Sequence, residues 1–341
     1  DADLKWEETT SFNVGLDFGF MDGRINGTLE YYHKNTNDLL FTVNIPAGTN
    51  LTDRILTNIG ELENKGVELT LDAWVVKNRA FSWNVGFNAA RNSNKVLAID
   101  RISEQGVLSG RISGGVGNFI QILQVGQPVN SFFVFQHKLD ASGKPLVDGI
   151  DHNDDGATDL KDIYEDLNGD GMVSDLDKRP YKKPAPDFLI GASTQVSFKG
   201  FDLALTVRGN IGNYVYNNNA SNGGYFNLVS ERGDLFLNNM HTSGLVTGFQ
   251  GPQYFSDYYV EDGSFFRVDN VTLGYTLPNM PGRSSLRVYV TAQNPLLFTK
   301  YSGIDPEVAF RSLTDVTATY GIDNNLYPRS RAFLFGVSLG L

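Results

Sequence analysis

Cysteine is absent from this chain of 341 residues, and histidine occurs only four times. Without cysteine there can be no disulfide framework, no thiolate zinc site and no thiol nucleophile. Basic residues are also fewer than acidic ones: the chain has 28 Lys and Arg against 39 Asp and Glu, which gives a formal net charge of -11. The chain therefore lacks the basic footprint of a nucleic-acid-binding protein, and we expect no nucleic acid among its partners.

Long apolar runs and familiar catalytic motifs are missing as well. No run approaches the roughly 18 apolar residues of a membrane helix, so any membrane-spanning structure here must be a β-barrel. The chain has no H-E-x-x-H, no G-x-S-x-G and no phosphate-cradling loop with a lysine. With so many acids, chance explains any neighbouring carboxylate pair, and we expect no enzyme. A hydrolase on a β-scaffold is the alternative, and it predicts turnover that depends on one such pair.

Period-two alternation of apolar and polar residues is what the chain does have. In the last stretch Phe333, Phe335, Val337, Leu339 and Leu341 share one face, as the side chains of a strand do. Nine such stretches are predicted strands, at about residues 11–20, 24–41, 58–76, from 81, 188–198, from 201, 264–276, from 286 and 333–341. A β-prone piece near Phe132–Phe135 lies between the fourth and fifth.

The connections between these stretches alternate in length. Short turns lie at 21–23, 77–80, 199–200 and 278–284, and long loops at 42–57, 98–186, 217–262 and 299–328. This pattern is typical of an antiparallel transmembrane β-barrel, whose short turns are periplasmic and whose long loops are extracellular. The rule predicts an outer-membrane location with the C-terminus in the periplasm. Nine is an odd number and leaves two exposed edges, so we expect further strands before Asp1, where neither Met nor a leader stands.

The polar face of the strands separates a barrel from a soluble β-sandwich. Strands in sandwiches are shorter, and buried charges there are costly, whereas a wet lumen accepts them. The residues expected to face such a lumen include Asn13, Asp17, Glu68, Asp72, Asp202 and Arg208. The alternative function is an extracellular calcium-dependent glycan-binding or adhesion β-domain, which predicts solubility without detergent.

Two twelve-residue segments within 98–186 match the spacing of calcium-binding loops. Residues 166–177 place possible oxygen ligands at Asp166, Asn168, Asp170, the carbonyl of Met172, Ser174 and Asp177. Residues 151–162 repeat the spacing with Asp151, Asn153, Asp155, the carbonyl of Ala157, Asp159 and Asp162. Calcium is the predicted ion and its role is structural, with weak binding expected because Asp replaces Glu at position 12. The alternative is that these residues only form turns.

The third long loop is rich in aromatic residues next to asparagines. It and its flanks contain Tyr214, Tyr216, Tyr225, Phe226, Tyr254, Phe255, Tyr258 and Tyr259. Aromatic faces beside amides suit sugar rings or peptides, and packing within the loops explains the same composition equally well.

Several blocks, in order along the chain, carry a resemblance to a family. They are N-I-G-E-L-E-N-K-G-V-E-L from Asn58, D-L-N-G-D-G from Asp166, P-A-P-D-F from Pro184, K-G-F-D-L from Lys199, V-E-D-G-S-F-F-R-V from Val260, N-V-T-L-G-Y from Asn270, Q-N-P from Gln293, Y-S-G-I-D-P-E from Tyr301 and Y-P-R from Tyr327. On these blocks the chain resembles SusC/RagA-type TonB-dependent transporters.

The resemblance implies a 22-stranded barrel closed by an N-terminal plug, of which residues 1–341 would be about the nine C-terminal strands. The plug and the segment that contacts TonB have no counterpart here. Members import oligosaccharides or peptides through the outer-membrane lipid, are driven by the TonB complex, and pair with a SusD-like surface lipoprotein. The terminal Leu341 departs from the aromatic residue that commonly ends such barrels.

Overall fold

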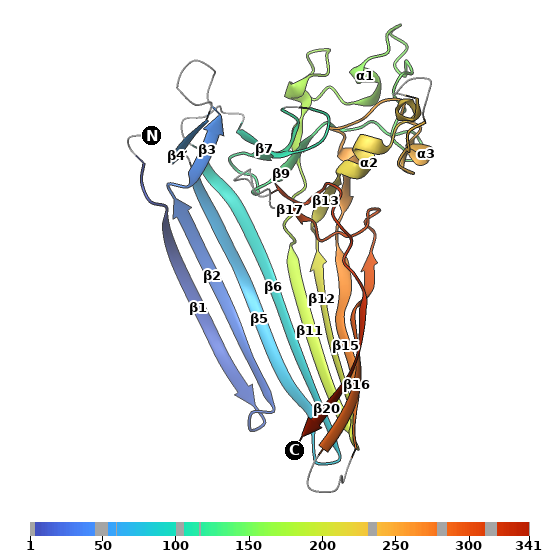
Figure 1. Ribbon diagram of the computed structural model, residues 1–341. Helices are drawn as coiled ribbons and strands as arrows, with labels where there is room; N and C mark the ends of the chain where they lie inside the picture. Colours follow the sequence, from blue (N-terminus) through green and yellow to red (C-terminus); the bar gives the residue numbers. More distant parts are fainter. Residues whose placement is uncertain are drawn as a thin grey trace.

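A nine-stranded antiparallel sheet dominates the computed structural model, which describes residues 4–44, 54–58, 60–99, 106–115, 117–230, 237–277, 285–310 and 319–340. The strands pair as neighbours in chain order, as Figure 1 shows. They are β1 (Glu8–Phe20), β2 (Ile25–Asn37), β5 (Gly60–Lys77), β6 (Phe81–Ile99), β11 (Phe188–Phe198), β12 (Phe201–Ile211), β15 (Phe265–Leu277), β16 (Ser285–Thr299) and β20 (Ala332–Gly340). All nine predicted strands are thus confirmed, and β1 and β20 are the two edges of this sheet.

Tight turns join the strands at one end of the sheet (Figure 1). Between β1 and β2, Met21, Asp22 and Gly23 all have positive φ, at 56°, 54° and 76°. Between β11 and β12 the turn is Lys199-Gly200, again with positive φ at both residues. Left-handed pairs of this kind match the twist of a hairpin. The turn predicted at 278–284 lies outside the described residues.

The long connections gather at the opposite end and carry small elements of their own (Figure 1). Two small sheets have two strands each, β3 (Leu40–Asn44) with β4 (Arg54–Asn58) and β17 (Ala309–Phe310) with β18 (Thr319–Tyr320). A four-stranded sheet contains β7 (Val107–Arg111), β8 (Phe119–Leu123), β9 (Ser131–Val134) and β10 (Arg179–Tyr181). A three-stranded sheet contains β13 (Tyr214–Asn217), β14 (Val260–Asp262) and β19 (Ile322–Asp323). The helices are α1 (Leu160–Ile163), η1 (Asp175–Asp177), α2 (Asn218–Gly223), η2 (Phe226–Val229), α3 (Gly244–Thr247) and η3 (Asp257–Tyr259). In the part of the chain that is described, no helix is long and apolar enough to cross a membrane.

The second predicted strand is wrong at its far end. The expected run 24–41 is two strands, β2 and β3, separated at Asp38, whose φ is 54°. A left-handed residue cannot continue a strand, and the side-chain amide of Asn58 holds the bend by donating to the carbonyl of Asp38 at 2.6 Å. The chain therefore leaves the main sheet earlier than predicted.

The two faces of the main sheet differ in polarity. Phe12, Val14, Leu16 and Phe20 of β1 are large exposed apolar residues on one face. The other face carries Asn13 and Asp17, and the register continues it through Tyr32, Thr28 and onward across the sheet. The larger clusters of buried apolar side chains lie instead among the loops. The sheet therefore has the two-faced pattern of a barrel wall, and the loops have the core of a globular unit.

Candidate functional site

The polar face places the predicted lumen residues on one surface. Glu68 of β5 lies directly opposite Glu30 of β2, and Asp72 lies opposite Asn26. Like charges directly opposite one another destabilise a strand pair, so this face is not arranged for stability alone. Around Asp72 a hollow of about 590 Å³ extends past Gly86 and Gly191 to Arg208. The wall is therefore recessed at this point, and charged side chains share the hollow with apolar ones.

One ion pair on the polar face crosses a whole strand. Arg287 of β16 reaches over β15 to Asp202 of β12, with Nε–Oδ1 and Nη2–Oδ2 distances of 3.0 and 2.5 Å. Gly274 lies between them, and a Cβ there would stand 2.5 Å from Arg287 Nη2 and 2.6 Å from Asp202 Oδ1. The glycine thus leaves the room that the bidentate pair occupies.

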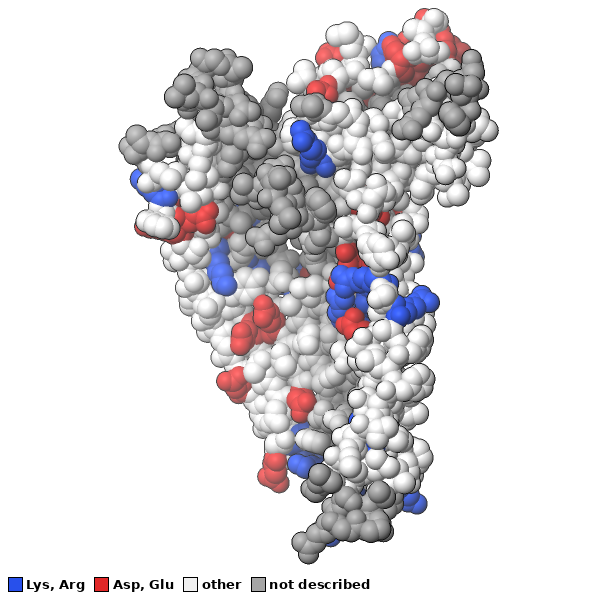
Figure 2. Space-filling view, viewed as in Figure 1, with Lys and Arg blue, Asp and Glu red and all other residues white. Residues whose placement is uncertain are grey.

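A larger charge cluster fixes the last long loop to the strand ends. Arg267 of β15 has only 2% of its side chain exposed and contacts Asp305 Oδ1 at 2.7 Å and Asn294 Oδ1 at 2.6 Å. Its Nε lies 3.0 Å from Glu307 Oε2 as an ion pair without a directed hydrogen bond. Glu307 also accepts hydrogen bonds from Arg208, from Nη1 to Oε1 at 2.5 Å and from Nη2 to Oε2 at 2.8 Å. Figure 2 shows basic and acidic side chains gathered where the strands meet the loops.

A bulge in β15 completes this cluster. The register with both neighbouring strands shifts between Val268 and Asn270, which leaves Asp269 unpaired and aimed at Arg208 Nε at 2.8 Å. Alternation predicts Arg208 on the polar face, but no role was predicted for Asp269, Arg267 or Glu307. The break in alternation at Asp269 was the available signal.

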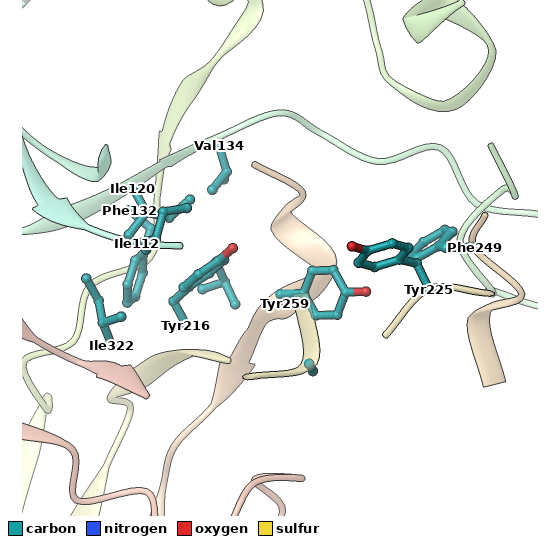
Figure 3. Close-up of a cluster of buried hydrophobic side chains, with 11 residues drawn as sticks. Ile112, Ile120, Phe132, Val134, Tyr216, Tyr225, Phe249, Tyr259 and Ile322 are labelled. Carbon is teal, nitrogen blue, oxygen red and sulfur yellow. The ribbon is translucent and has the colours of Figure 1, made fainter. Parts of the chain in front are cut away.

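The aromatic residues of the third loop mostly form a core. Tyr216, Tyr225 and Tyr259 are buried with Phe249 and residues of the second loop, among them Phe132, as Figure 3 shows. The Tyr216 hydroxyl donates to the carbonyl of Tyr254 and lies 2.8 Å from Ser221 Oγ. Of the two alternatives for these aromatics, packing holds for the buried ones. Tyr258 and Phe255 remain partly exposed at the margin of the core.

Buried polar groups connect the second and third long loops by hydrogen bonds and ring contacts. The ring of His137 makes an edge contact with Tyr164 and a tilted contact with Phe249. Its Nδ1 lies 2.9 Å from Ser256 Oγ, and its Nε2 lies 2.9 Å from the carbonyl of Leu146. Burial lowers the pKa of His137, so the ring is neutral in the folded loops. Burial also raises the pKa of Asp257, although Arg179 lies 3.2 Å away. These groups act as structural anchors.

In the loop 166–177 the side-chain oxygens of the predicted ligands accept hydrogen bonds from backbone amides of the same loop. Asp166 accepts hydrogen bonds from the amides of Gly169 and Gly171, and Asp170 accepts one from Met172. Asp177 accepts the amides of Leu167, Asn168 and Ser174, which lowers its pKa. Asn168 accepts the amide of Asp170, and Ser174 caps the helix η1. The predicted ligands therefore surround one turn.

The loop 151–162 folds in the same way, with one difference. Asp151 accepts the amides of Asp155 and Gly156, Asn153 also accepts the amide of Asp155, and Asp155 accepts the amide of Ala157. Asp159 and Asp162 form a capping box. Lys161 Nζ, however, lies 2.9 Å from Asp155 Oδ2 and supplies a positive charge within the loop. Ala157 offers only its backbone. Across the described ranges no group of three or more His, Cys, Asp or Glu side chains is arranged to hold a metal ion, so calcium binding stays a prediction.

Comparison with known proteins shows that the chain is similar to TonB-dependent receptors. Residues 1–110 match the family described as TonB dependent receptor-like, beta-barrel. The TonB-dependent receptor SusC of Bacteroides thetaiotaomicron is 38% identical over 99% of this chain and 32% of its own length. The TonB-dependent receptor P3 of Formosa agariphila is 30% identical over 98% of this chain and 34% of its own length.

A solved structure shares the fold. The RagAB peptide transporter superimposes with a TM-score of 0.72 at 24% identity, over 100% of this chain and 36% of that one. This likeness concerns the fold, and it agrees with a sheet that is one part of a larger barrel wall. The chain spans about one third of the length of the curated relatives it matches.

Proposed function

We propose, since this chain belongs to the SusC/RagA-type TonB-dependent receptors, that it forms a wall sector and the loop unit of an outer-membrane importer of oligosaccharides or peptides. Transport of this kind is binding followed by passage, so no residue of the chain needs to form or break a covalent bond. The proposed whole includes a plug domain.

The observation that carries this proposal is the polarity of the nine-stranded sheet. Its apolar face exposes residues such as Phe12, Phe20, Phe333 and Phe335. Its polar face carries a charged, recessed surface around Asp72 and Arg208. A face of exposed aromatic and aliphatic side chains is stable against lipid and not against water, whereas the polar face suits a wet lumen.

Orientation and partners follow as parts of the same proposal. The tight turns would lie in the periplasm with the C-terminus, and the folded loops would lie outside the cell. A SusD-like surface lipoprotein would cover the loops, and the TonB complex would supply energy through the part of the protein that precedes these residues. The dependence on TonB is supported by the similarity to SusC, a TonB-dependent receptor, and the shared fold with the RagAB peptide transporter agrees with an importer.

Uptake by whole cells tests the proposal. A strain that lacks the gene, complemented with the intact protein, should accumulate labelled oligosaccharide or peptide only when TonB is present. The matched control is the same strain with an intact receptor and a disrupted TonB. Uptake that is indifferent to TonB, or that persists without the receptor, would contradict the proposal.

The calcium-dependent adhesion domain is the second candidate. It predicts a β-domain that is soluble without detergent. The broad exposed apolar face of the main sheet argues against this candidate, because water would meet it over its full length.

A further inference from the structure

A pocket of about 430 Å³ opens on the loop unit, apart from the barrel wall. Segments distant in the sequence line it, including His241, Ser243, Tyr258, Tyr259, Glu261 and Ser302. Its volume lies within the range of small-molecule sites. None of its lining residues is a lysine or arginine.

Glu261 forms a fixed negative charge in this pocket. Its Oε1 accepts hydrogen bonds from Asn217 Nδ2 at 2.9 Å and from Ser302 Oγ at 2.8 Å, and its Oε2 accepts the amide of Ser302 at 2.8 Å. Asn217 is buried, so the amide that donates to the carboxylate belongs to the packed interior of the loops. All three donors are neutral, and within the described ranges no ion pair involves Glu261. The carboxylate is thus preorganised but its charge is not balanced.

Tyr258 supplies an aromatic wall next to this charge. Its ring makes edge contacts with Tyr259 and Phe249, at centroid distances of 5.2 and 6.2 Å. These contacts leave the ring little freedom to turn. Burial and the nearby Glu261 raise the pKa of Tyr258, so its hydroxyl stays neutral.

We propose that this pocket binds a cationic side chain of a peptide cargo, through Glu261 and the ring of Tyr258; this inference rests on the proposed function. A carboxylate beside an aromatic face attracts an ammonium or guanidinium group by charge and by cation–π contact. An anionic group would meet the uncompensated charge of Glu261 and be repelled. A neutral sugar would gain only single hydrogen bonds from the same carboxylate, which makes it the weaker fit.

Calorimetry on the intact protein in detergent tests the pocket with three probes: acetyl-Gly-Lys-Gly amide, acetyl-Gly-Glu-Gly amide and maltotriose. The Lys peptide should bind, more weakly as ionic strength rises, and the Glu peptide should not. Glu261→Gln should weaken the Lys peptide about tenfold. Glu165→Gln removes the same charge outside the pocket lining and should change nothing.

A second variant keeps the test sound if Glu261→Gln disturbs the loops. Tyr258→Ala leaves the hydrogen bonds of Glu261 in place and should also weaken the Lys peptide, whereas Tyr258→Phe should keep it. Equal binding of the Lys and Glu peptides, no binding of the Lys peptide, or preference for maltotriose would each overturn the assignment. TonB-dependent uptake is measured separately, so the pocket can fail while the proposed function stands.

Discussion

Arg267 should be among the costliest residues to replace in this chain. It is 2% exposed, and it holds Asp305 and Glu307 at 2.7 and 3.0 Å, both of them more than four-fifths buried. Arg267→Gln leaves two largely buried carboxylates with less positive charge nearby. Removing one partner of a buried pair typically costs about 3–5 kcal/mol, so we expect a loss of unfolding free energy in that range.

Urea unfolding of the intact protein in lipid vesicles measures this loss. Lys65→Gln is the matched control, because the ion pair of Lys65 with Glu63 at 2.8 Å involves a half-exposed lysine. Exposed pairs contribute little, and the denaturation midpoint should not move. The last long loop should also become more sensitive to protease near residues 304–308 in the Arg267 variant, since that loop is fixed by the cluster.

A double-mutant cycle separates the pair from its surroundings. Glu307→Gln leaves Arg208 with Asp269 and Arg267 with Asp305. The double variant should therefore be more stable than the sum of the single losses predicts, by about 0.5–3 kcal/mol. A loss of less than about 1 kcal/mol for Arg267→Gln, as for a surface pair, would refute the reasoning.

The remaining predictions concern the wall and the two calcium-like loops. Gly274→Ala should displace Arg287 from Asp202 and destabilise the protein by about 1–3 kcal/mol. The control Gly15→Ala should be tolerated, because its new Cβ meets Glu30 at an ordinary 3.4 Å. Equal urea midpoints for the two variants would contradict this prediction. Calcium should slow proteolysis within 166–177 more than within 151–162, because Lys161 already neutralises Asp155 in the second of these loops. Asp166→Asn should abolish this difference. If millimolar calcium protects neither loop from protease, the predicted calcium ion is rejected. Because backbone amides lower the pKa of Asp177, its contribution is present above the unfolded value of about 3.9 and is lost as the pH falls through the lower folded value. Hydrogen-exchange protection of 167–174, measured relative to the unfolded chain at the same pH, should accordingly fall on acidification, and Asp177→Asn should show low protection at both pH values; an acid-insensitive wild type would count against this.

Alternation predicted the wall because each strand obeys it. From Phe12 to Phe20 and from Phe333 to Leu339 every second residue is apolar, and the structure pairs these strands in the expected order. Where local backbone overrides the pattern the prediction fails. Asp38 adopts a left-handed conformation and ends β2 early, at a point where the polar run 35–38 gives way to the apolar run 39–41.

The clusters that bind distant segments were beyond sequence reasoning. Arg208 and Glu307 are 99 residues apart, and only the bulge at Asp269 and the return of the last loop bring them together. The pocket around Glu261 likewise needs Ser302, which belongs to another loop. The loops at 151–162 and 166–177 are the opposite case, because the hydrogen bonds of their predicted ligand side chains stay within each loop and their spacing reveals the fold of the turn.

The absence of cysteine allows a direct test of the central claim, that the sheet spans the outer membrane with its loops outside. Single cysteines are introduced by Met172→Cys in the loop 166–177 and by Met21→Cys in the tight turn after β1; these side chains are 66% and 69% exposed. Any cysteine elsewhere in the intact protein is first replaced. A membrane-impermeant maleimide should label the Met172 variant on intact cells and the Met21 variant only after permeabilisation. Labelling of both variants on intact cells would contradict the account.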